Sequence, residues 1–559
     1  MYLGIDVGGT HTDGALLDQN YELIETVKVP TRSDDVLGSF LAALTRLLAD
    51  VDPIKVKRLV VSSTLGLNTI LTGRADPVGV LATSGPGLPP DNTATPFFAV
   101  LGGSLDHRGE ALALVSAQEA EAAAADLMKQ GATAFAVISK FGPKNPTFED
   151  LLAGAVQAAA PGRPVTRASR LAGRLNFPRR LNTAVFNSAV TRLYDRFIRE
   201  LKGAMNKAGL DCPVSLLTAD GGALPLERAA QTPVYVLAAG PAAGLLGLWS
   251  MVGSTDDALM IDIGGTSTDL AVMADGEPLM TPEGLTINGR PTLVRAFLTH
   301  SIALGGDSRL SVVPGRPDTG PVTVGPVREG PAVALKPGDL GRRAPTLTDA
   351  LNVLDLTAVG EVGVSRQALA GLSARPPEET ATHALNTALA MIKDAADHLL
   401  KQVNNRPVYT VGAVRLARSV RPARAAILGG PSTALAEPIG RALKLPAEVP
   451  EAAQVANAIG AARARPCLAA ELYADTALGA MTIPALNLSE TIDRNYNQTR
   501  AENDILEAMR DRLKDEDQAG PPQIIEAESF NQLVGYGVAD KIIRIRAQAA
   551  PGFLKGAGS

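Results

Sequence analysis

Two stretches far apart in the chain share one arrangement of residues that could bind an anion. GIDVGGTHTDGALL fills residues 4–17, and MIDIGGTSTDLAVM fills residues 260–273. In each copy an aspartate lies in an apolar run, a Gly-Gly-Thr turn follows, and Thr-Asp precedes a second apolar run. Glycines let backbone amides approach an anion closely, and threonine hydroxyls add donors. The first aspartate fits beside a phosphate when a divalent cation or a transferable proton lies between them.

The repetition of this pattern decides between two interpretations. A single Gly-Gly turn can simply close a hairpin. Neither copy is a P-loop, because the motif GxxxxGK[ST] is absent. Two matching copies instead predict two similar domains that face one another and clamp phosphates between them. Such an arrangement resembles that of the actin, Hsp70 and sugar-kinase superfamily.

A third glycine-rich turn fits the same site. AAILGGPSTALAEPIGRAL (425–443) predicts a strand, a turn at Gly429 and Gly430, and a helix. A Gly-Gly turn after a strand lets a flat purine or a ribose approach the backbone. In the superfamily that the chain resembles, the late Gly-Gly turn lies at the adenosine. An ordinary strand-to-helix turn is the alternative.

The surrounding pattern predicts the elements that position these turns. Apolar runs predict strands at 3–7, 14–17, 58–62, 78–82, 134–138, 214–217, 258–263 and 425–428, and helical periodicity predicts helices at 34–50, 117–131, 182–209 and 378–403. This alternation predicts an α/β fold. Residues 310–345 are expected to be loops and short β-structure, and the polar segment after about residue 487 to form a helix with a small β appendage.

Composition narrows the class of protein. A net charge of −5 over 559 residues, with 4% aromatic residues, argues against a nucleic-acid-binding protein. Two cysteines, Cys212 and Cys467, exclude a disulfide scaffold and a four-cysteine zinc site. The start MYLGIDVGG lacks the basic residues of a signal peptide, so a cytoplasmic location is expected.

One uncharged stretch has the length of a membrane span. Residues 233–253 carry no charge, and Gly240 and Gly244 have the GxxxG spacing of paired membrane helices. Pro241 directly follows Gly240, however, and predicts a turn that breaks the run. We therefore expect a buried strand, a tight turn and a core helix here, with no membrane contact.

Several blocks in order resemble the hydantoinase/oxoprolinase family, specifically the A subunit of ATP-dependent hydantoinases. GIDVGGTHTD looks like the opening of that family, and the similarity continues through STLGLNTIL (63–71), LDHRGE (105–110), TADGGALPLERAAQTPVYVLAAGPAAG (218–244), TLTDALNVL (346–354) and VPEAAQVANAIGAA (449–462). It covers roughly residues 1–465. Three departures stand out: VSST (61–64) replaces the usual HGTT, the block 299–345 is altered, and the tail beyond about residue 487 is unlike the family. These departures concern the part of the site expected to bind substrate, and they leave the expected nucleotide-binding motifs intact.

The resemblance implies a fold and a division of the chain. It implies two duplicated actin/Hsp70/sugar-kinase-like (ribonuclease H-like) α/β domains that face each other across a nucleotide cleft, with insertions. Residues 1–180 would form the N-terminal domain with the first phosphate motif. Residues 181–486 would form the second, actin-like ATPase domain, and residues 487–559 the C-terminal appendage.

The resemblance also implies an activity. Family members use ATP to activate a cyclic amide such as a hydantoin or 5-oxoproline, or a ketone for carboxylation. We expect phosphorylation of a lactam carbonyl oxygen, with ATP and Mg²⁺ as cofactors and a separate B-type subunit as partner. Asp6 and Asp262 are the expected catalytic residues and would bind Mg²⁺ and its waters. Nucleotide-binding roles fall to Gly8, Gly9, Thr10, Thr12, Asp13, Gly264, Gly265, Thr266, Thr268, Asp269, Gly429 and Gly430. Asp13 and Asp269 could instead lock the turns by accepting backbone N–H bonds.

Other residues and functions stay open at this point. His11 could face substrate or metal, Asn68 and Thr69 could line the substrate pocket, and Asp220–Gly222 and Asp307 could lie near the nucleotide. We favour a surface salt-bridged turn for Asp106–Arg108. The alternatives in function are the ATP-using component of an acetone- or acetophenone-type carboxylase and an ATP-dependent factor that reactivates a partner protein. The substrate ring, activity without a B-type partner, and assembly into a homo-oligomer are not fixed by the sequence.

Overall fold

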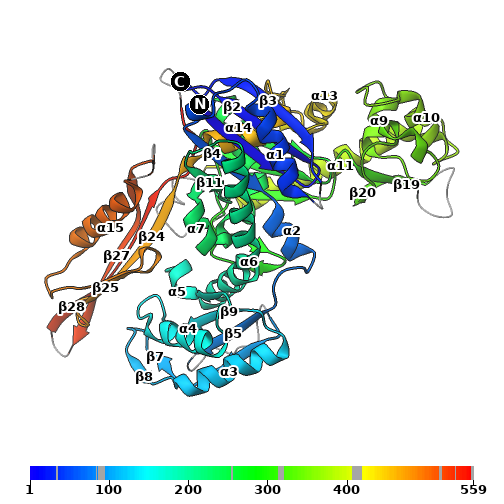
Figure 1. Cartoon of the computed structure of the whole chain (residues 1–559). Helices are drawn as coiled ribbons and strands as arrows, with labels where there is room; N and C mark the ends of the chain where they lie inside the picture. Colours follow the sequence, from blue (N-terminus) through cyan, green and yellow to red (C-terminus); the bar gives the residue numbers. More distant parts are fainter. Residues whose placement is uncertain are drawn as a thin grey trace.

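The computed structural model describes residues 1–559 except 33–34, 84, 86–94, 254–255, 282, 313–319, 406–417, 515, 517–518, 535–536 and 556–559. The fold is mixed α/β, as predicted, and two large sheets form its centre (Figure 1). The first sheet has the order β23 (Arg465–Pro466), β12 (Gly222–Pro225), β11 (Val214–Leu217), β4 (Arg58–Ser63), β1 (Tyr2–Val7), β2 (His11–Leu17), β3 (Leu23–Pro30). Segments on both sides of residue 180 thus build one sheet.

The second sheet repeats the central plan of the first. Its order is β15 (Glu277–Pro278), β14 (Thr268–Ala274), β13 (Ala258–Ile263), β21 (Arg424–Leu428), β22 (Ala447–Glu448), and β18 (Thr299–Ile302) also pairs with β14. In each sheet an antiparallel hairpin is followed by a parallel neighbour of its first strand: β1 pairs with β2 and β4, and β13 pairs with β14 and β21. Asp6 therefore lies opposite Asp13, as Asp262 lies opposite Asp269.

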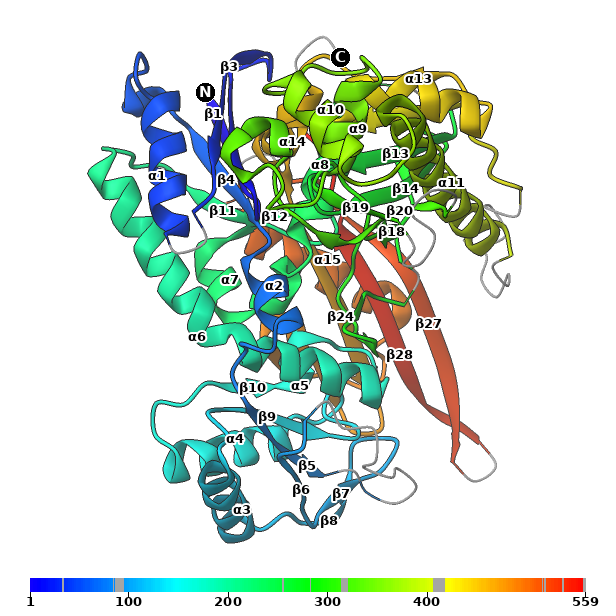
Figure 2. The same ribbon diagram turned by 90° about the vertical axis from the view of Figure 1, so that its right-hand side faces the viewer.

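An α/β insertion follows β4 and α2 (Leu65–Leu71) in the chain and lies at the bottom of Figure 2. Its sheet has the order β10 (Val165–Arg167), β9 (Ala134–Ser139), β5 (Val78–Thr83), β6 (Phe98–Val100). The helices α3 (Ala117–Gln130) and α4 (Thr147–Ala159) pack on it, next to the small hairpin β7 (Ser104–Leu105) and β8 (Ala111–Ala113). The predicted strands at 78–82 and 134–138 and the predicted helix at 117–131 are confirmed here.

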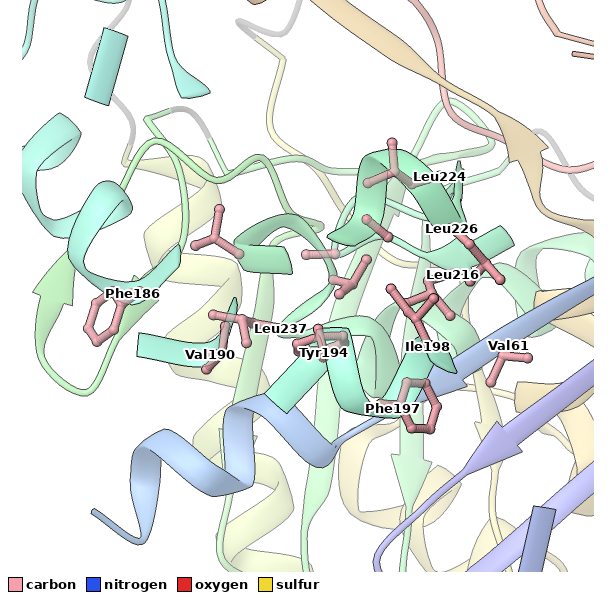
Figure 3. Packing of buried hydrophobic residues seen from close by; sticks show 14 of the residues in the cluster. Val61, Phe186, Val190, Tyr194, Phe197, Ile198, Leu216, Leu224, Leu226 and Leu237 are labelled. Carbon is pink, nitrogen blue, oxygen red and sulfur yellow. The ribbon is translucent and has the colours of Figure 1, made fainter. Parts of the chain in front are cut away.

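A 31-residue helix, α6 (Phe177–Lys207), connects the insertion to the first sheet. It begins before the predicted residue 182 because the Asn176 side chain caps it by accepting the Arg179 N–H, and Pro178 fits its first turn. Figure 3 shows Ile198 of this helix beside Leu216 of β11, and Tyr194 beside Leu237. Around this core lie α1 (Val36–Leu47), α2 (Leu65–Leu71), α5 (Ala168–Leu171) and α7 (Leu226–Gln231).

The uncharged stretch at 233–253 corrects one prediction. It holds no strand: a 3₁₀ turn (Pro233–Val236) leads into α8 (Ala239–Val252). Pro241 does not break α8, because it lies in the first helical turn, where N–H groups have no partner four residues earlier. Among the described residues, no helix has both the length and the apolar character needed to cross a membrane.

Two helices rich in small residues cross between the sheets. Gly460 of α14 (Ala456–Arg463) lies so near α8 that a Cβ there would meet the Ala243 carbonyl oxygen at 2.2 Å. A Cβ on Gly4 of β1 would likewise meet the Ala458 oxygen at 2.0 Å. This close packing places the start of α14 beside both hairpins.

The remaining elements flank this centre. Next to the second sheet lie β19 (Ser308–Val312), β20 (Val322–Arg328), α9 (Leu347–Val353), α10 (Val362–Ala370), α11 (Pro377–Asn404) and α13 (Ser432–Leu443), which confirms the helix predicted at 378–403. The short pair β16 (Thr286–Ile287) and β17 (Arg290–Pro291) contacts α6.

The C-terminal part has a sheet of its own, with the order β26 (Leu488–Thr491), β25 (Ala480–Ile483), β24 (Leu468–Asp475), β28 (Gly537–Ala549), β27 (Pro522–Val534). The helix α15 (Gln498–Leu513) packs on it. The hairpin of β27 and β28 projects from the body in both views (Figures 1 and 2).

Candidate functional site

The two Gly-Gly-Thr turns are closed by equivalent hydrogen bonds. The Gly8 N–H donates to the His11 carbonyl at 3.0 Å, and the Gly264 N–H donates to the Ser267 carbonyl at 2.9 Å. In the part of the chain that the structure describes, the amides at the turn tips donate no hydrogen bond; these belong to Gly9, Thr10, Gly265 and Thr266. Each turn thus presents free donors of the kind that bind phosphate oxygens.

The aspartates near the ends of β1 and β13 both have raised pKa values. Asp6 is buried, and its Oδ2 accepts a hydrogen bond from Asn457 Nδ2 at 3.2 Å, while its Oδ1 has no partner among the described residues. Burial raises the pKa of Asp6 to about 6, and the charge on Asp13 adds to this. Burial, followed by the charges on Asp269 and Asp6, raises the pKa of Asp262 to about 7. The two hairpins therefore bring their carboxylates within electrostatic range of each other.

Asn457 and Gly244 occupy the space between these carboxylates. A Cβ on Gly244 of α8 would lie 2.6 Å from Asp262 Oδ2 and 3.0 Å from Asn457 Oδ1. Residues from β1, β13, α8 and α14 thus meet at one point. Asn457 was not among the residues predicted from sequence, although it lies in the ANAIGAA block of the family resemblance.

The alternative role of the second aspartates, which was to accept backbone N–H bonds, is not seen among the described residues. Instead of accepting backbone N–H bonds, Asp13 pairs with Lys28 Nζ at 2.7 and 2.9 Å, and Lys28 also donates to the Gln454 carbonyl at 3.1 Å. Burial raises the pKa of Asp269, and the side chain of Ser301 on β18 lowers it in part. A lysine on β3, which no sequence pattern indicated, neutralises the first of these carboxylates.

The buried threonines of the motifs use their hydroxyls within the protein. Thr12 Oγ1 lies 2.9 Å from Thr31 Oγ1, and Thr268 Oγ1 donates to the Leu304 carbonyl at 2.7 Å. Thr10 and Thr266 lie at the turn tips, and Thr266 is exposed. Thr12 and Thr268 therefore fix the loops next to the turns.

An arginine links the two turns. Arg328 Nη2 donates to Thr10 Oγ1 at 3.2 Å and to Asp307 Oδ2 at 3.0 Å. Asp307 lies against the second turn, because its N–H donates to the Gly265 carbonyl at 2.8 Å. His11 is near the same groups, and partial desolvation, followed by the charge on Lys28, lowers its pKa. Asp307 was a sequence candidate; Arg328 was not.

The third Gly-Gly turn packs against the end of β13. Gly429 has φ +91°, and a Cβ there would lie 2.0 Å from the Ile263 carbonyl oxygen and 3.1 Å from Asp262 Oδ1. Gly430, in contrast, has open space around its Cβ position. The twelve-residue helix α13 starts directly afterwards at Ser432. This turn therefore lies beside the second aspartate.

The other sequence candidates have local partners. Asn68 and Thr69 on α2 hydrogen-bond within their own helix, to Thr64 and to Leu65. Asp106 accepts the N–H groups of Arg108 and Glu110, both at 2.8 Å, and Arg108 lies 3.7 Å from Asp475 of the C-terminal sheet. The turn is thus salt-bridged, as expected, but the ion pair is to the C-terminal sheet and is largely buried, where a surface turn was expected.

The loop at Asp220–Gly222 is likewise tied to its surroundings. Asp220 accepts a hydrogen bond from Thr218 at 2.5 Å and lies 3.9 Å from the Arg295 guanidinium. The Cys467 thiol lies nearby, and burial raises its pKa. Over the described residues, no group of three or more His, Cys, Asp or Glu side chains is arranged to hold a metal ion.

The fold and site define an α/β protein in which two equivalent hairpins bring carboxylates and free turn amides together. The hydantoinase/oxoprolinase N-terminal region matches residues 2–159, and the hydantoinase/oxoprolinase domain matches residues 180–469. The chain therefore belongs to the hydantoinase/oxoprolinase family.

Individual relatives are distant in sequence. An uncharacterized protein of Methanocaldococcus jannaschii is 23% identical over 393 residues, which is 63% of this chain and 56% of that protein. The chain thus spans little more than half the length of this curated relative.

Two solved structures share the fold along nearly the whole chain. A nucleotide-free acetone carboxylase structure has a TM-score of 0.71 at 16% identity and covers 99% of this chain and 87% of its own. The ATP-dependent caprolactamase of Pseudomonas jessenii has a TM-score of 0.68 at 17% identity. The match covers 98% of this chain and 87% of the caprolactamase chain. At these identities the likeness concerns the fold.

Proposed function

We propose that this chain binds ATP between the two Gly-Gly-Thr turns and phosphorylates the carbonyl oxygen of a cyclic amide for hydrolysis. The substrate would be a hydantoin, 5-oxoproline or another lactam, and the chain would act as an A-type subunit with a separate B-type subunit. The observation that carries the proposal is the pairing of two equivalent hairpins, with Asp6 and Asp262 in electrostatic range and four turn amides free. Family membership supports it.

The nucleotide would lie between duplicated domains of the actin/Hsp70/sugar-kinase (ribonuclease H-like) type. The shared plan of the two sheets, each with a hairpin and a parallel third strand, supports this assignment. Gly429 and Gly430 would lie at the adenosine, because their turn follows β21, the parallel neighbour of β13. The free amides of the turns would bind the β- and γ-phosphates.

The chemistry follows from the weakness of a lactam as an electrophile. Its nitrogen donates electron density into the carbonyl, so water attacks the carbon slowly. Transfer of the γ-phosphoryl group to the carbonyl oxygen makes that oxygen a good leaving group. Transfer of this kind depends mainly on positioning and on neutralisation of negative charge, which the turn amides supply.

The carboxylates fit a magnesium ion. Asp6 Oδ1 is buried without a partner, and carboxylate oxygens are the ligands that Mg²⁺ takes, usually one or two of them together with waters and phosphate oxygens. Asp6 and Asp262 would hold the ion or its waters. When bound, Mg²⁺ supplies positive charge that neutralises the phosphates.

Phosphate release by the purified chain tests the proposal. Hydantoins, 5-oxoproline, simple lactams, and small ketones with bicarbonate are compared in the presence of ATP and Mg²⁺, with and without the B-type partner. We expect stimulation by one class of cyclic amide and its loss in Asp6→Asn and Asp262→Asn. Asp106→Asn, in a turn of the insertion outside the site, is the matched control and should retain activity. Stimulation by ketones alone would favour carboxylation. Stimulation only by another protein would favour a reactivating factor.

A further inference from the structure

The side chain of Arg328 connects the two turns of the site. It lies at the end of β20, and its Nε and Nη2 both donate to Asp307 Oδ2, at 3.1 and 3.0 Å. Nη2 also donates to Thr10 Oγ1 at 3.2 Å. A single guanidinium therefore contacts the first turn and the loop that covers the second turn.

The loop that holds Asp307 is firmly fixed to the second turn. The Gly306 N–H donates to the Gly264 carbonyl at 3.0 Å, and a Cβ on Gly305 would lie 2.5 Å from the Gly265 backbone. Thr348 of α9 binds the Gly306 carbonyl through both its N–H, at 3.0 Å, and its hydroxyl, at 2.9 Å. Asp307 thus presents a fixed negative charge, with only 13% of its side chain exposed, beside the free amides of the turn.

Arg328 keeps the capacity to bind a further anion. Its side chain is 38% exposed, and both of its contacts with Asp307 go to one carboxylate oxygen. Its Nη1 donates to no acceptor among the described residues. A guanidinium has five donors in a planar fork that matches the oxygens of a phosphoryl group. The neutral hydroxyl of Thr10 is a weaker acceptor than a phosphate oxygen.

We propose that Arg328 binds the γ-phosphoryl group of the nucleotide and positions it for transfer, with Asp307 holding the guanidinium in place. The Thr10 contact is exchanged for phosphate oxygens when the nucleotide enters. This inference rests on the proposed function, because it requires a nucleoside triphosphate between the turns. An arginine here neutralises the charge on the group that is transferred. Because ADP lacks that group, Arg328 distinguishes the triphosphate from the diphosphate.

Binding of two nucleotides to the full chain tests this role. The dissociation constants of ADP and of AMP-PNP, both with Mg²⁺, are measured by calorimetry for the wild type, Arg328→Gln and Arg328→Lys. We expect Arg328→Gln to raise the dissociation constant of AMP-PNP by about tenfold to a hundredfold, which is the range for loss of a charged hydrogen bond. The dissociation constant of ADP should change by no more than about twofold. Arg328→Lys retains the positive charge but lacks the planar set of guanidinium donors, so its affinity for AMP-PNP should lie between those of the wild type and Arg328→Gln.

Arg309→Gln is the matched control. Arg309 lies on the neighbouring strand β19 and is 3.7 Å from Glu329, so its loss should change neither affinity. Equal weakening of both nucleotides by Arg328→Gln, at an unchanged melting temperature, would assign Arg328 a purely structural role and overturn the inference. So would unchanged affinities. A wild type that binds neither nucleotide would overturn the proposed function itself, and the inference with it.

Discussion

The side chain of Asn457 donates a hydrogen bond to Asp6 at 3.2 Å, although the two residues are 451 positions apart in the chain. Close packing of α14 against β1 and α8, through Gly4 and Gly460, places Asn457 there. On its other side, Asn457 Oδ1 shares the space at Gly244 with Asp262 Oδ2. One amide thus lies between the carboxylates of both hairpins and orients the first of them.

Loss of this amide should impair ATP use. We expect Asn457→Ala to lower substrate-stimulated phosphate release by about 10- to 100-fold, the usual effect of removing a group that orients a metal-binding side chain. The Mg²⁺ concentration that gives half-maximal rate should rise as well. Asn404→Ala is the control: Asn404, the last residue of α11, donates a hydrogen bond to the Val420 carbonyl. The rate of this variant should match that of the wild type. Equal rates in both variants would show that Asn457 only packs.

Asp262→Asn should stabilise the ligand-free protein while abolishing turnover. Folding raises the pKa of Asp262 from 3.8 to about 7, chiefly through burial, so above pH 7 the folded protein holds an unfavourable charge. Between about pH 4 and 7 the folded state binds more protons than the unfolded state, and wild-type stability therefore falls as the pH rises through this window.

Denaturant unfolding at several pH values checks this prediction. The stability difference between Asp262→Asn and the wild type should be small at pH 4, grow up to about pH 7 and then stay constant. A difference that does not change with pH would mean that the carboxylate is not strained by its surroundings. The expected loss of phosphate release in the same variant separates the functional cost from the gain in stability.

The third Gly-Gly turn allows a comparison of adjacent glycines. Gly429→Ala should lower stability by at least about 2 kcal/mol, because φ is +91° and the new methyl group would overlap the Ile263 carbonyl. Gly430→Ala, which meets open space, should change stability by no more than about 0.5 kcal/mol. Urea unfolding measures both variants, and equal stabilities would contradict the packing of this turn on β13.

A buried carboxylate on α4 ties this helix to the end of β9 and to α5. Glu149 accepts the N–H of Ser139 at 3.0 Å and both the N–H and the hydroxyl of Ser169, at 2.8 and 2.7 Å. Glu149→Ala leaves these donors buried without a partner, and we expect a loss of about 3 kcal/mol or more in unfolding free energy.

Two comparison variants complete this test. Glu149→Gln keeps an acceptor and should lose less stability than Glu149→Ala. Glu121→Ala, at an exposed position of α3, should have almost no effect. A loss of similar size in Glu121→Ala would contradict the assignment of Glu149 as the anchor.

The local elements and the two hairpins were predictable from sequence because their signals are local. The β13 strand at 258–263 and the β11 strand at 214–217 follow directly from apolar runs. The core helix expected within 233–253 is present as α8, but the strand and turn expected before it were wrong, because a proline in the first helical turn has the same local signature as a proline in a turn, and only the burial of the whole segment between the sheets distinguishes them.

The groups that complete the site depend on contacts between distant segments. Asn457 reaches Asp6 and Arg328 reaches Thr10 only through the packing of helices and loops, whereas Lys28 lies directly opposite Asp13 across the β2–β3 pair. No periodicity or spacing in a single sequence indicates such pairs. The motif residues were therefore recognised, but the charges that surround them were not.

The fate of the carbonyl oxygen tests the central claim most directly. A cyclic amide that stimulates phosphate release is labelled with ¹⁸O at its carbonyl and turned over by the wild-type chain with its B-type partner, and the released phosphate is analysed by mass spectrometry. Phosphorylation of that oxygen predicts one ¹⁸O atom in each phosphate formed. Unlabelled phosphate, with all of the label left in the ring-opened product, would contradict the account.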